Sequence, residues 1–344
     1  MKILITGASG FIGFHLAERL LNDGLEVIGV DNLNTYYDIK LKEDRLKYSG
    51  IELNQDYPYE TKSHKFSKYI FYKCDLKNKK DIYEIIKKER PSAICHLAAQ
   101  AGVRYSIENP QAYIDSNIIG FQNIIDACRD FQIKNFVFAS SSSVYGGNTN
   151  LPFRTSDRVD APISLYAATK RSNELVAHTY AHLFDIQCTG LRFFTVYGPW
   201  GRPDMALFLF VEALRKNKPI NVFNNGEMLR DFTYIDDIVE GVKKVIENPA
   251  KAPKKSTKEN PTAAPFKIYN IGNNNPVKLM DFIKEIEIAY GKKFKMNMMP
   301  LQQGDVPETY ADVTQLVEDL NYKPKTSISY GIGKFVDWYN SYYN

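Results

Sequence analysis

Cysteine is scarce in this sequence, and the cysteines that are present stand far apart. The chain of 344 residues has four, at positions 74, 95, 128 and 188, and no two of them form a Cys-x-x-Cys pair. This spacing offers neither a zinc site nor a disulfide framework, and it is typical of proteins from a reducing compartment.

Long apolar runs are also missing. No stretch is long enough to cross a bilayer, and the opening residues MKILITGASGFIG lack the charged region and long apolar core of a signal peptide. We therefore expect a soluble cytoplasmic protein that does not use a membrane.

A strong excess of charge is absent as well. The net charge is +4, and no basic patch interleaved with aromatic residues stands out, so nucleic acid is not an expected partner. His178 and His182 share a helical face at the spacing of metal ligands, but no Glu follows His178 and no third ligand is evident. We expect no metal site.

What the sequence does contain is a regular alternation of predicted strands and helices. This order predicts an α/β fold with a doubly wound parallel (Rossmann) sheet, in which ligands bind beyond the carboxyl ends of the strands. The predicted strands cover residues 2–6, 26–31, 69–74, 93–97, 136–139 and 188–194, and the predicted helices cover residues 11–21, 79–88, 110–131 and 166–184.

The composition changes at VYGPWGRPDM, a run rich in Gly and Pro that follows Thr195. We predict a Rossmann domain over residues 1–194, to which later segments contribute, and a smaller C-terminal α/β substrate-binding domain over residues 195–344. We interpret residues 32–68 as an excursion on the rim of the sheet and residues 248–265 as a solvated surface loop.

The first predicted strand runs directly into a Gly-x-x-Gly-x-x-Gly turn and a helix. Gly7, Gly10 and Gly13 let backbone N–H groups approach a pyrophosphate at the positive end of that helix, which begins with Phe11 and Ile12. The order strand, glycine turn, helix and strand is the context of a dinucleotide-binding site. A turn that only packs helix on strand is the weaker interpretation.

Asp31 ends the second predicted strand, where its carboxylate can accept hydrogen bonds from the adenosine ribose hydroxyls. It would repel a 2′-phosphate, so we expect NAD and not NADP; an ordinary acidic strand end is the alternative. Small residues at the end of the fourth strand suit close approach of a ligand. The further cofactor contacts that we predict at strand ends are Asn32, Asp75, Leu76, Leu97, Ala98 and Ala99.

Tyr166 and Lys170 are four residues apart and therefore share one face of a predicted helix. An ammonium beside a phenol favours the phenolate, which would make Tyr166 a usable base near neutral pH. Such pairs also occur on solvated helix faces, so the setting decides. Here the serine run ASSSSVYG, which includes Ser141, follows the preceding strand and adds hydroxyl groups.

The glycine turn, the serine run and the Tyr-x-x-x-Lys pair, in this order, resemble the extended short-chain dehydrogenase/reductase family. Within that family the chain is similar to the UDP-glucuronate 4-epimerases over nearly its whole length. The segments that carry this resemblance are AAQAGVRYSIENP, ASSSSVYG, SLYAATK, LRFFTVYGPWGRPDMA, RDFTYIDD, YNIGNNNPVKLMDFI and QGDVPETYAD.

The resemblance implies reversible epimerisation at carbon-4 of UDP-glucuronate, giving UDP-galacturonate through a transient 4-keto sugar with NAD bound. Tyr166 would take the proton of the 4-hydroxyl group. Lys170 would lower the pKa of Tyr166 and bind the nicotinamide ribose, while Ser141 would hydrogen-bond the reacting oxygen. Asn117 resembles an asparagine near the nicotinamide, although a neighbouring loop could equally satisfy its side chain.

A sugar carboxylate needs hydrogen-bond donors, and Arg202 in GRPDM could supply a bidentate fork. Its alternative role is a pair with Asp204. Ser142, Ser143 and Thr195 could add hydroxyl donors. Related decarboxylases carry Glu where Ser143 stands, so its absence here favours epimerisation with the carboxyl group retained.

Other residues are assigned to the substrate by resemblance alone. Arg230 would bind the diphosphate, with a pair to Asp231 as the alternative, and Asp305 would contact the uridine ribose. Arg104 would face the sugar.

Three other functions stay open at this point. They are a 4-epimerase of UDP-glucose or a UDP-N-acetylhexosamine, a UDP-glucuronate decarboxylase, and a non-catalytic NAD-binding regulator; the intact Tyr166, Lys170 and Ser141 count against the last. The family also implies a homodimer formed by the helix that carries Tyr166 and the helix before it. The apolar positions in that preceding helix are Ile118, Phe121, Ile124 and Ile125.

Overall fold

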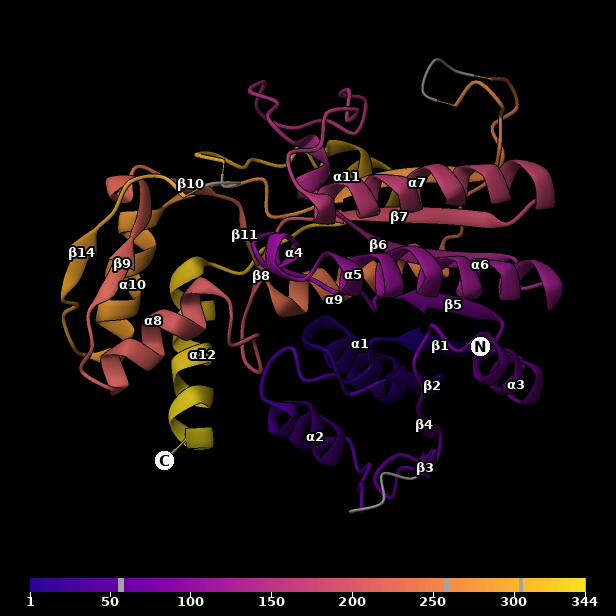
Figure 1. The fold of residues 1–344 in the computed structure, drawn as a ribbon, viewed down its shortest axis with the longest axis horizontal. Helices are drawn as coiled ribbons and strands as arrows, with labels where there is room; N and C mark the ends of the chain where they lie inside the picture. Colours follow the sequence, from indigo (N-terminus) through magenta and orange to yellow (C-terminus); the bar gives the residue numbers. More distant parts are fainter. Residues whose placement is uncertain (55–58, 257–259, 303–305, 344) are drawn as a thin grey trace.

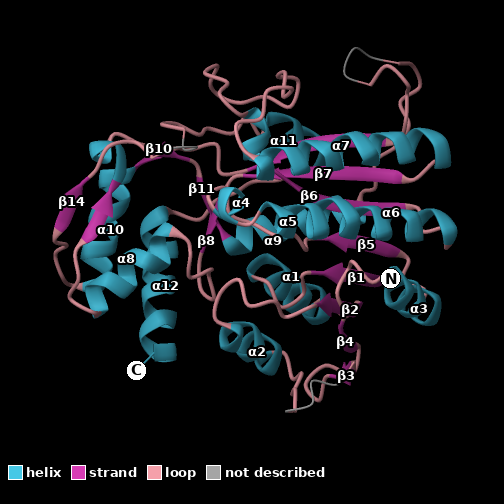
Figure 2. Cartoon of the chain, viewed as in Figure 1, coloured by secondary structure: helices cyan, strands magenta, loops and turns pink. Residues whose placement is uncertain are grey.

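A computed structural model describes residues 1–54, 59–256, 260–302 and 306–343 of the chain. Within these residues, an eight-stranded sheet has the order β12-β7-β6-β5-β1-β2-β4-β3. Every neighbouring pair is parallel except β3 with β4. The predicted α/β class with a doubly wound parallel sheet is confirmed (Figures 1 and 2).

The central strands of this sheet are buried on both faces, and their apolar side chains alternate between two cores. In β1, Ile3 and Ile5 pack into one core and Leu4 into the other. The strands are β1 (Lys2–Thr6), β2 (Glu26–Asp31), β3 (Glu60–Lys62), β4 (Tyr69–Lys73), β5 (Ala93–His96), β6 (Asn135–Ser141), β7 (Gln187–Phe193) and β12 (Phe266–Ile271).

Helices cover both faces of the sheet. The first core holds α1 (Phe11–Asn22), α2 (Ile39–Tyr48) and α9 (Ile235–Glu247). The second core holds α3 (Lys79–Glu89), α6 (Gly120–Asp130) and α7 (Leu165–Phe184). The predicted helix over residues 110–131 is a series of α5 (Pro110–Tyr113), a π-helical turn η1 (Ile114–Ile119) and α6, after the short α4 (Tyr105–Glu108).

The chain after β7 builds a smaller region beside one end of the sheet (Figure 1). The segments β12 and α9 return from it to complete the sheet and its cover; the division at residue 194 itself stays a prediction. The elements of this region are β8 (Thr195–Tyr197), α8 (Ala206–Arg215), β9 (Ile220–Val222), η3 (Phe223–Gly226), β10 (Leu229–Arg230), β11 (Phe232–Tyr234), β13 (Val277–Lys278), α10 (Leu279–Tyr290), β14 (Met296–Met298) and α12 (Ile328–Tyr343). The helix α11 (Thr314–Leu320) instead contacts β12 of the large sheet. None of the helices in the described residues combines the length and apolarity needed to cross a membrane.

A fully buried arginine joins three segments that are distant in the sequence. Arg45 of α2 donates to the carbonyl of Ser9 (2.9 Å), the hydroxyl of Tyr37 (2.7 Å) and the carbonyl of Trp200 (2.6 Å). Its guanidinium therefore fixes the turn after β1 against the loop after β8. Part of the segment that we interpreted as a rim excursion thus lies deep in the molecule.

A second buried cation fixes α7 against the sheet. Arg192 of β7 forms a bidentate pair with Glu174 of α7, with distances of 2.8 Å from Nε to Oε1 and 2.9 Å from Nη2 to Oε2. Ser140 of β6 donates to the same carboxylate at 2.6 Å. Glu174 is four residues after Lys170 and eight after Tyr166, so this network sets the rotation of the helix that carries both.

Replacing Arg192 by Met should remove the buried bidentate partner of the Glu174 carboxylate and leave it only Arg171, a less buried cation at 3.0 Å. We expect the free energy of unfolding to fall by about 3–5 kcal/mol, as is typical when one partner of a buried pair is removed, and urea denaturation followed by circular dichroism measures it. Arg158→Met is the matched control, because Arg158 pairs with Asp160 on the surface (2.9 Å) and its loss should change little. Equal effects of the two substitutions would contradict a stabilising role for the network.

Candidate active site

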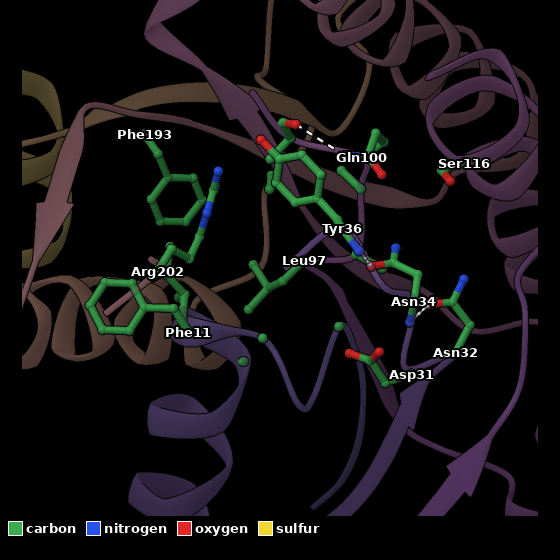
Figure 3. A pocket seen from close by; sticks show the side chains of 18 of the residues that line it. Phe11, Asp31, Asn32, Asn34, Tyr36, Leu97, Gln100, Ser116, Phe193 and Arg202 are labelled. Atoms are coloured by element: carbon green, nitrogen blue, oxygen red, sulfur yellow. Dashed lines mark hydrogen bonds between the residues drawn. The ribbon is translucent and has the colours of Figure 1, made fainter. Parts of the chain in front are cut away.

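A cavity lies at the carboxyl ends of the strands, where the doubly wound topology places ligands. Figure 3 shows Asp31 and Asn32 on one side of it and Arg202, with Phe11 and Phe193, on the other. The predicted site residues that line this cavity are Gly7, Gly10, Phe11, Ile12, Gly13, Asp31, Asn32, Asp75, Leu76, Leu97, Ala98, Ala99, Ser141, Tyr166, Lys170 and Arg202.

The glycine turn has the geometry that an anion-binding turn needs. Gly7 has φ +73°, and a Cβ on it would lie 2.9 Å from the backbone nitrogen of Ala98. A Cβ on Gly13 would lie 2.1 Å from the carbonyl oxygen of Gly7. Gly10 precedes α1 and has no side chain to cap the helix, so the first N–H groups of α1 are available to a phosphate.

The carboxylate of Asp31 is held in place by two backbone N–H groups. Ser9 donates to Oδ2 at 3.2 Å and Leu33 donates to Oδ1 at 2.9 Å. Asn32 bridges to the next strand end by donating to Asp75 at 3.2 Å. Together with the glycine turn, this wall fits a dinucleotide whose adenosine ribose carries free hydroxyl groups.

Lys170 and Tyr166 both face the cavity from α7. The Nζ of Lys170 donates to the carbonyl of Ala139 at 2.9 Å, and burial lowers the pKa of Lys170 to about 8. Burial raises the pKa of Tyr166, while a hydrogen bond from Ser141 and the positive charge of Arg202 act in the opposite direction. Arg202 thus contributes a lowering charge that the sequence did not predict, and the effect that we expected of Lys170 stays a prediction.

Arg202 lines the cavity and also pairs with Asp204, the alternative partner considered for it; its contact with a sugar carboxylate stays a prediction. Its Nε lies 3.0 Å from Oδ1 and its Nη2 lies 2.5 Å from Oδ2 of Asp204. Burial acts to raise the pKa of Asp204, but the charge and hydrogen bonds of Arg202 outweigh burial and hold that pKa below its ordinary value. Tyr36 also donates to Oδ2 of Asp204, at 3.1 Å.

Three predicted carboxylate-binding residues lie near this cavity without lining it. The hydroxyls of Ser141 and Ser143 lie within hydrogen-bond distance, 3.1 Å apart, and Ser142 begins the same short 3₁₀ turn, η2 (Ser142–Tyr145). Thr195 lines a smaller cavity that adjoins the first and shares Arg202 with it.

Asn117 lies behind the cavity in the π-helical turn. Its side chain accepts from the backbone N–H of Gln100 (2.8 Å) and donates to the carbonyl of Gln100 (3.1 Å) and the hydroxyl of Thr169 (3.1 Å). These bonds match the alternative interpretation, in which a neighbouring loop forms the hydrogen bonds of the Asn117 side chain. Asn117 thus holds the loop after β5 against α7, and its contact with a cofactor stays a prediction.

The residues predicted for the uridine diphosphate end lie outside this cavity. Arg230 donates to the carbonyls of Val306 (2.6 Å) and Pro307 (2.8 Å) and forms no bond with Asp231, whose carboxylate instead accepts backbone N–H groups. Arg104 is exposed, with its guanidinium 5.4 Å from the centre of the Phe223 ring. Asp305 lies outside the described residues.

Several lining residues were missed from the sequence. Lys42 is 5% exposed and donates to the backbone and side-chain oxygens of Asn34, each at 2.7 Å. Lys42 and Arg45 are three residues apart and point inward with Leu41 and Leu46, so the helical pattern of this segment carried a signal. The other missed lining residues include Asn34, Tyr36, Tyr37, Ser116, Phe193 and Met205.

Metal ligands do not gather anywhere in the part of the chain that the structure describes: no group of three or more His, Cys, Asp or Glu side chains could hold an ion there. His178 instead bonds the hydroxyl of Thr262, at 3.0 Å. The four cysteines are buried and free.

Comparison with known proteins shows the family of this chain. The model of the NAD dependent epimerase/dehydratase family matches residues 3–272. The chain belongs to this family. Members of high similarity include "Protein CapI" of Staphylococcus aureus, 54% identical over all of this chain and 99% of that protein. "Probable UDP-glucuronate 4-epimerase" of Rhizobium meliloti is 44% identical, over all of this chain and 98% of that protein.

A solved structure supports the same placement within the epimerase/dehydratase family. The UDP-glucuronic acid 4-epimerase of Bacillus cereus, in complex with UDP-glucuronic acid and NAD, superimposes with a TM-score of 0.85. It is 33% identical, and the match covers all of both chains. The resemblance inferred from the sequence motifs is thereby confirmed.

The pKa of Lys170 gives a testable titration. Below pH of about 8 its side chain should be mostly the ammonium, and above it mostly the neutral amine. Lys40 is the reference, because its hydrogen bond to Asp44 raises its pKa above 10.5. In the isotope-labelled protein without bound nucleotide, the Cε resonance of Lys170, assigned with Lys170→Met, should shift near pH 8 and that of Lys40 should not. A Lys170 resonance constant up to pH 10 would contradict this.

Proposed function

We propose that this protein interconverts UDP-glucuronate and UDP-galacturonate by epimerising carbon-4, with NAD as a bound cofactor. The observation that carries the proposal is the guanidinium of Arg202 in the wall of the cavity that also holds Tyr166 and Ser141. A fork of this kind suits a sugar carboxylate. The named UDP-glucuronate 4-epimerases among the relatives give further support.

The cofactor would be held by residues that already fit a dinucleotide. The N–H groups after the glycine turn would hold the pyrophosphate, Asp31 the adenosine ribose and Lys170 the nicotinamide ribose. When bound, NAD supplies a reversible hydride acceptor for carbon-4 of the sugar. Lys170 suits this role because its ammonium has three N–H donors and the carbonyl of Ala139 accepts only one of them, so the others can bind the ribose hydroxyls.

Tyr166 would take the proton of the 4-hydroxyl group and later return it. Because burial raises its pKa, the opposing effects of Ser141 and Arg202 are needed to bring the phenol toward a useful range. Ser141, hydrogen-bonded to Tyr166, would also bond the reacting oxygen. Proton transfer by a placed side chain typically contributes about 10²–10⁴-fold to a rate.

We propose that the carboxylate of the sugar binds Arg202, with hydroxyl donors from Ser142, Ser143 and Thr195. Ser143 places no carboxylic acid where related decarboxylases carry one, which favours retention of the carboxyl group. An epimerase of neutral or N-acetylated UDP-hexoses is a weaker candidate, because such a sugar has no anion for Arg202.

The uridine diphosphate end is proposed to extend toward Arg230 and Arg104, with Asp305 at the ribose. Support for this direction comes from Arg230, which already binds the carbonyls of the segment just after Asp305. Support also comes from Arg104 and Phe223, which bring the loop after β5 against the smaller region.

Product analysis tests the proposal. The purified protein should convert UDP-glucuronate into a mixture with UDP-galacturonate, without carbon dioxide or UDP-pentose, as followed by chromatography and mass spectrometry. Tyr166→Phe is the matched control: it should lose at least 10²-fold in turnover and keep its NAD. Turnover of UDP-glucose with UDP-glucuronate untouched would contradict the role of Arg202, and UDP-pentose as main product would indicate decarboxylation.

We further propose a cytoplasmic homodimer formed through α6 and α7, which lie side by side (Figure 1). The free thiols suit a reducing compartment. Of the four apolar residues that we had considered for this interface, Phe121, Ile124 and Ile125 are buried in the monomer's own core, and Ile118 is half-buried. The exposed candidates are instead Leu175 and Leu183, whose spacing of eight places them on one side of α7.

Charge on this side of α7 should separate the subunits. The double substitution Leu175→Glu and Leu183→Glu should give a monomer in light scattering after gel filtration, because two carboxylates cannot be buried unpaired. Leu209→Glu, an equally exposed leucine on α8, should leave the dimer intact. A double variant that stays dimeric would place the interface elsewhere.

A further inference from the structure

Arg202 has its own carboxylate partner, Asp204, and that pair occupies only one side of the guanidinium. A guanidinium offers two forks for a carboxylate, one at Nε and one Nη, the other at the two Nη atoms. Asp204 occupies the first, through Nε at 3.0 Å and Nη2 at 2.5 Å. The second fork points in a different direction in the same plane.

Asp204 does not line the cavity, although its two partners Arg202 and Tyr36 do. Arg202, Met205 and Tyr36 line the cavity, whereas Asp204 is exposed and is not part of its wall. Arg202 therefore presents part of its side chain to the cavity, whereas Asp204 contributes nothing to the wall. The pair with Asp204 and a bond to a ligand carboxylate are compatible at the same time.

Asp204 is itself held by Tyr36, from the loop after β2. The hydroxyl of Tyr36 donates to Oδ2 of Asp204 at 3.1 Å. The ring of Tyr36 packs against Tyr105 at 5.0 Å between centres, and a Cβ on Gly102 would lie 2.4 Å from the Tyr36 hydroxyl. The phenol thus has little room to move, and Asp204 is a fixed partner for a long, otherwise flexible side chain.

We infer that Asp204 is a positioning residue, which holds Arg202 with its free fork toward the sugar carboxylate and so sets the preference for acidic over neutral UDP-sugars. This inference rests on the proposed function. A flexible arginine loses conformational entropy when it binds a ligand, and this loss weakens binding. Because Asp204 already holds the guanidinium of Arg202, most of that entropy is lost before the sugar binds. The gain is confined to ligands that carry a carboxylate.

The test is Asp204→Asn in the NAD-loaded full chain, with binding measured by calorimetry in a Tyr166→Phe background that prevents turnover. We expect the Kd for UDP-glucuronate to rise about tenfold, while the Kd values for UDP and UDP-glucose stay unchanged. With Tyr166 intact, Asp204→Asn should raise KM for UDP-glucuronate more than it lowers kcat. Asp204→Glu, which keeps a carboxylate, should recover part of the affinity.

Asp160→Asn is the matched control, because Arg158 and Asp160 form a pair of the same spacing on the surface (2.9 Å). It should change none of the three Kd values. Tighter binding of UDP-glucuronate by Asp204→Asn would overturn the inference, since Asp204 would then compete with the sugar for Arg202. An equal loss for UDP and UDP-glucuronate would also overturn it. Failure of the proposed function is seen separately, as an unsubstituted protein that makes no UDP-galacturonate.

Discussion

The buried guanidinium of Arg45 is the contact on which the two ends of the site depend. A cation removed from water must find acceptors, and Arg45 finds them in Ser9, beside the glycine turn, and in Trp200, in the loop that carries Arg202. One side chain from α2 thus sets the distance between the turn that fits a pyrophosphate and the arginine that fits a sugar carboxylate. A shift of either segment would leave a buried charge unsatisfied, so the two ends are expected to move together or not at all.

Arg202 connects recognition of the sugar with the proton chemistry. Its charge lowers the pKa of Tyr166, and its free fork is the proposed partner of the sugar carboxylate. A bound carboxylate would offset part of that charge, so an acidic sugar would reduce the extent to which Arg202 lowers the pKa of Tyr166. Lys170 also faces the cavity, from the same helix as Tyr166, and its importance for Tyr166 should therefore grow when the sugar is bound.

Most of the fold could be predicted from the sequence because its signals are local. Gly7, Gly10 and Gly13 follow a strand directly, and Tyr166 and Lys170 share a helix face, so short-range spacing was sufficient to identify both features. Lys42 and Tyr36 were missed because they lie in a polar segment whose return to the cavity depends on Arg45. Asn117 needed tertiary information, since only the fold shows that Gln100 and Thr169 use up its hydrogen-bonding groups.

The place of β12 has a consequence for how the chain is made. The strand β12 hydrogen-bonds to the outer edge of β7, and the pairing runs from Phe266 with Cys188 to Ile271 with Phe193. A ribosome releases β7 first and must then synthesise the loop with Arg202, α8 and α9 before β12 emerges. During that interval β7 presents open N–H and C=O groups, which invite pairing with another nascent chain. The eight-stranded sheet that carries the glycine turn is therefore completed only after the ribosome has synthesised the chain through β12.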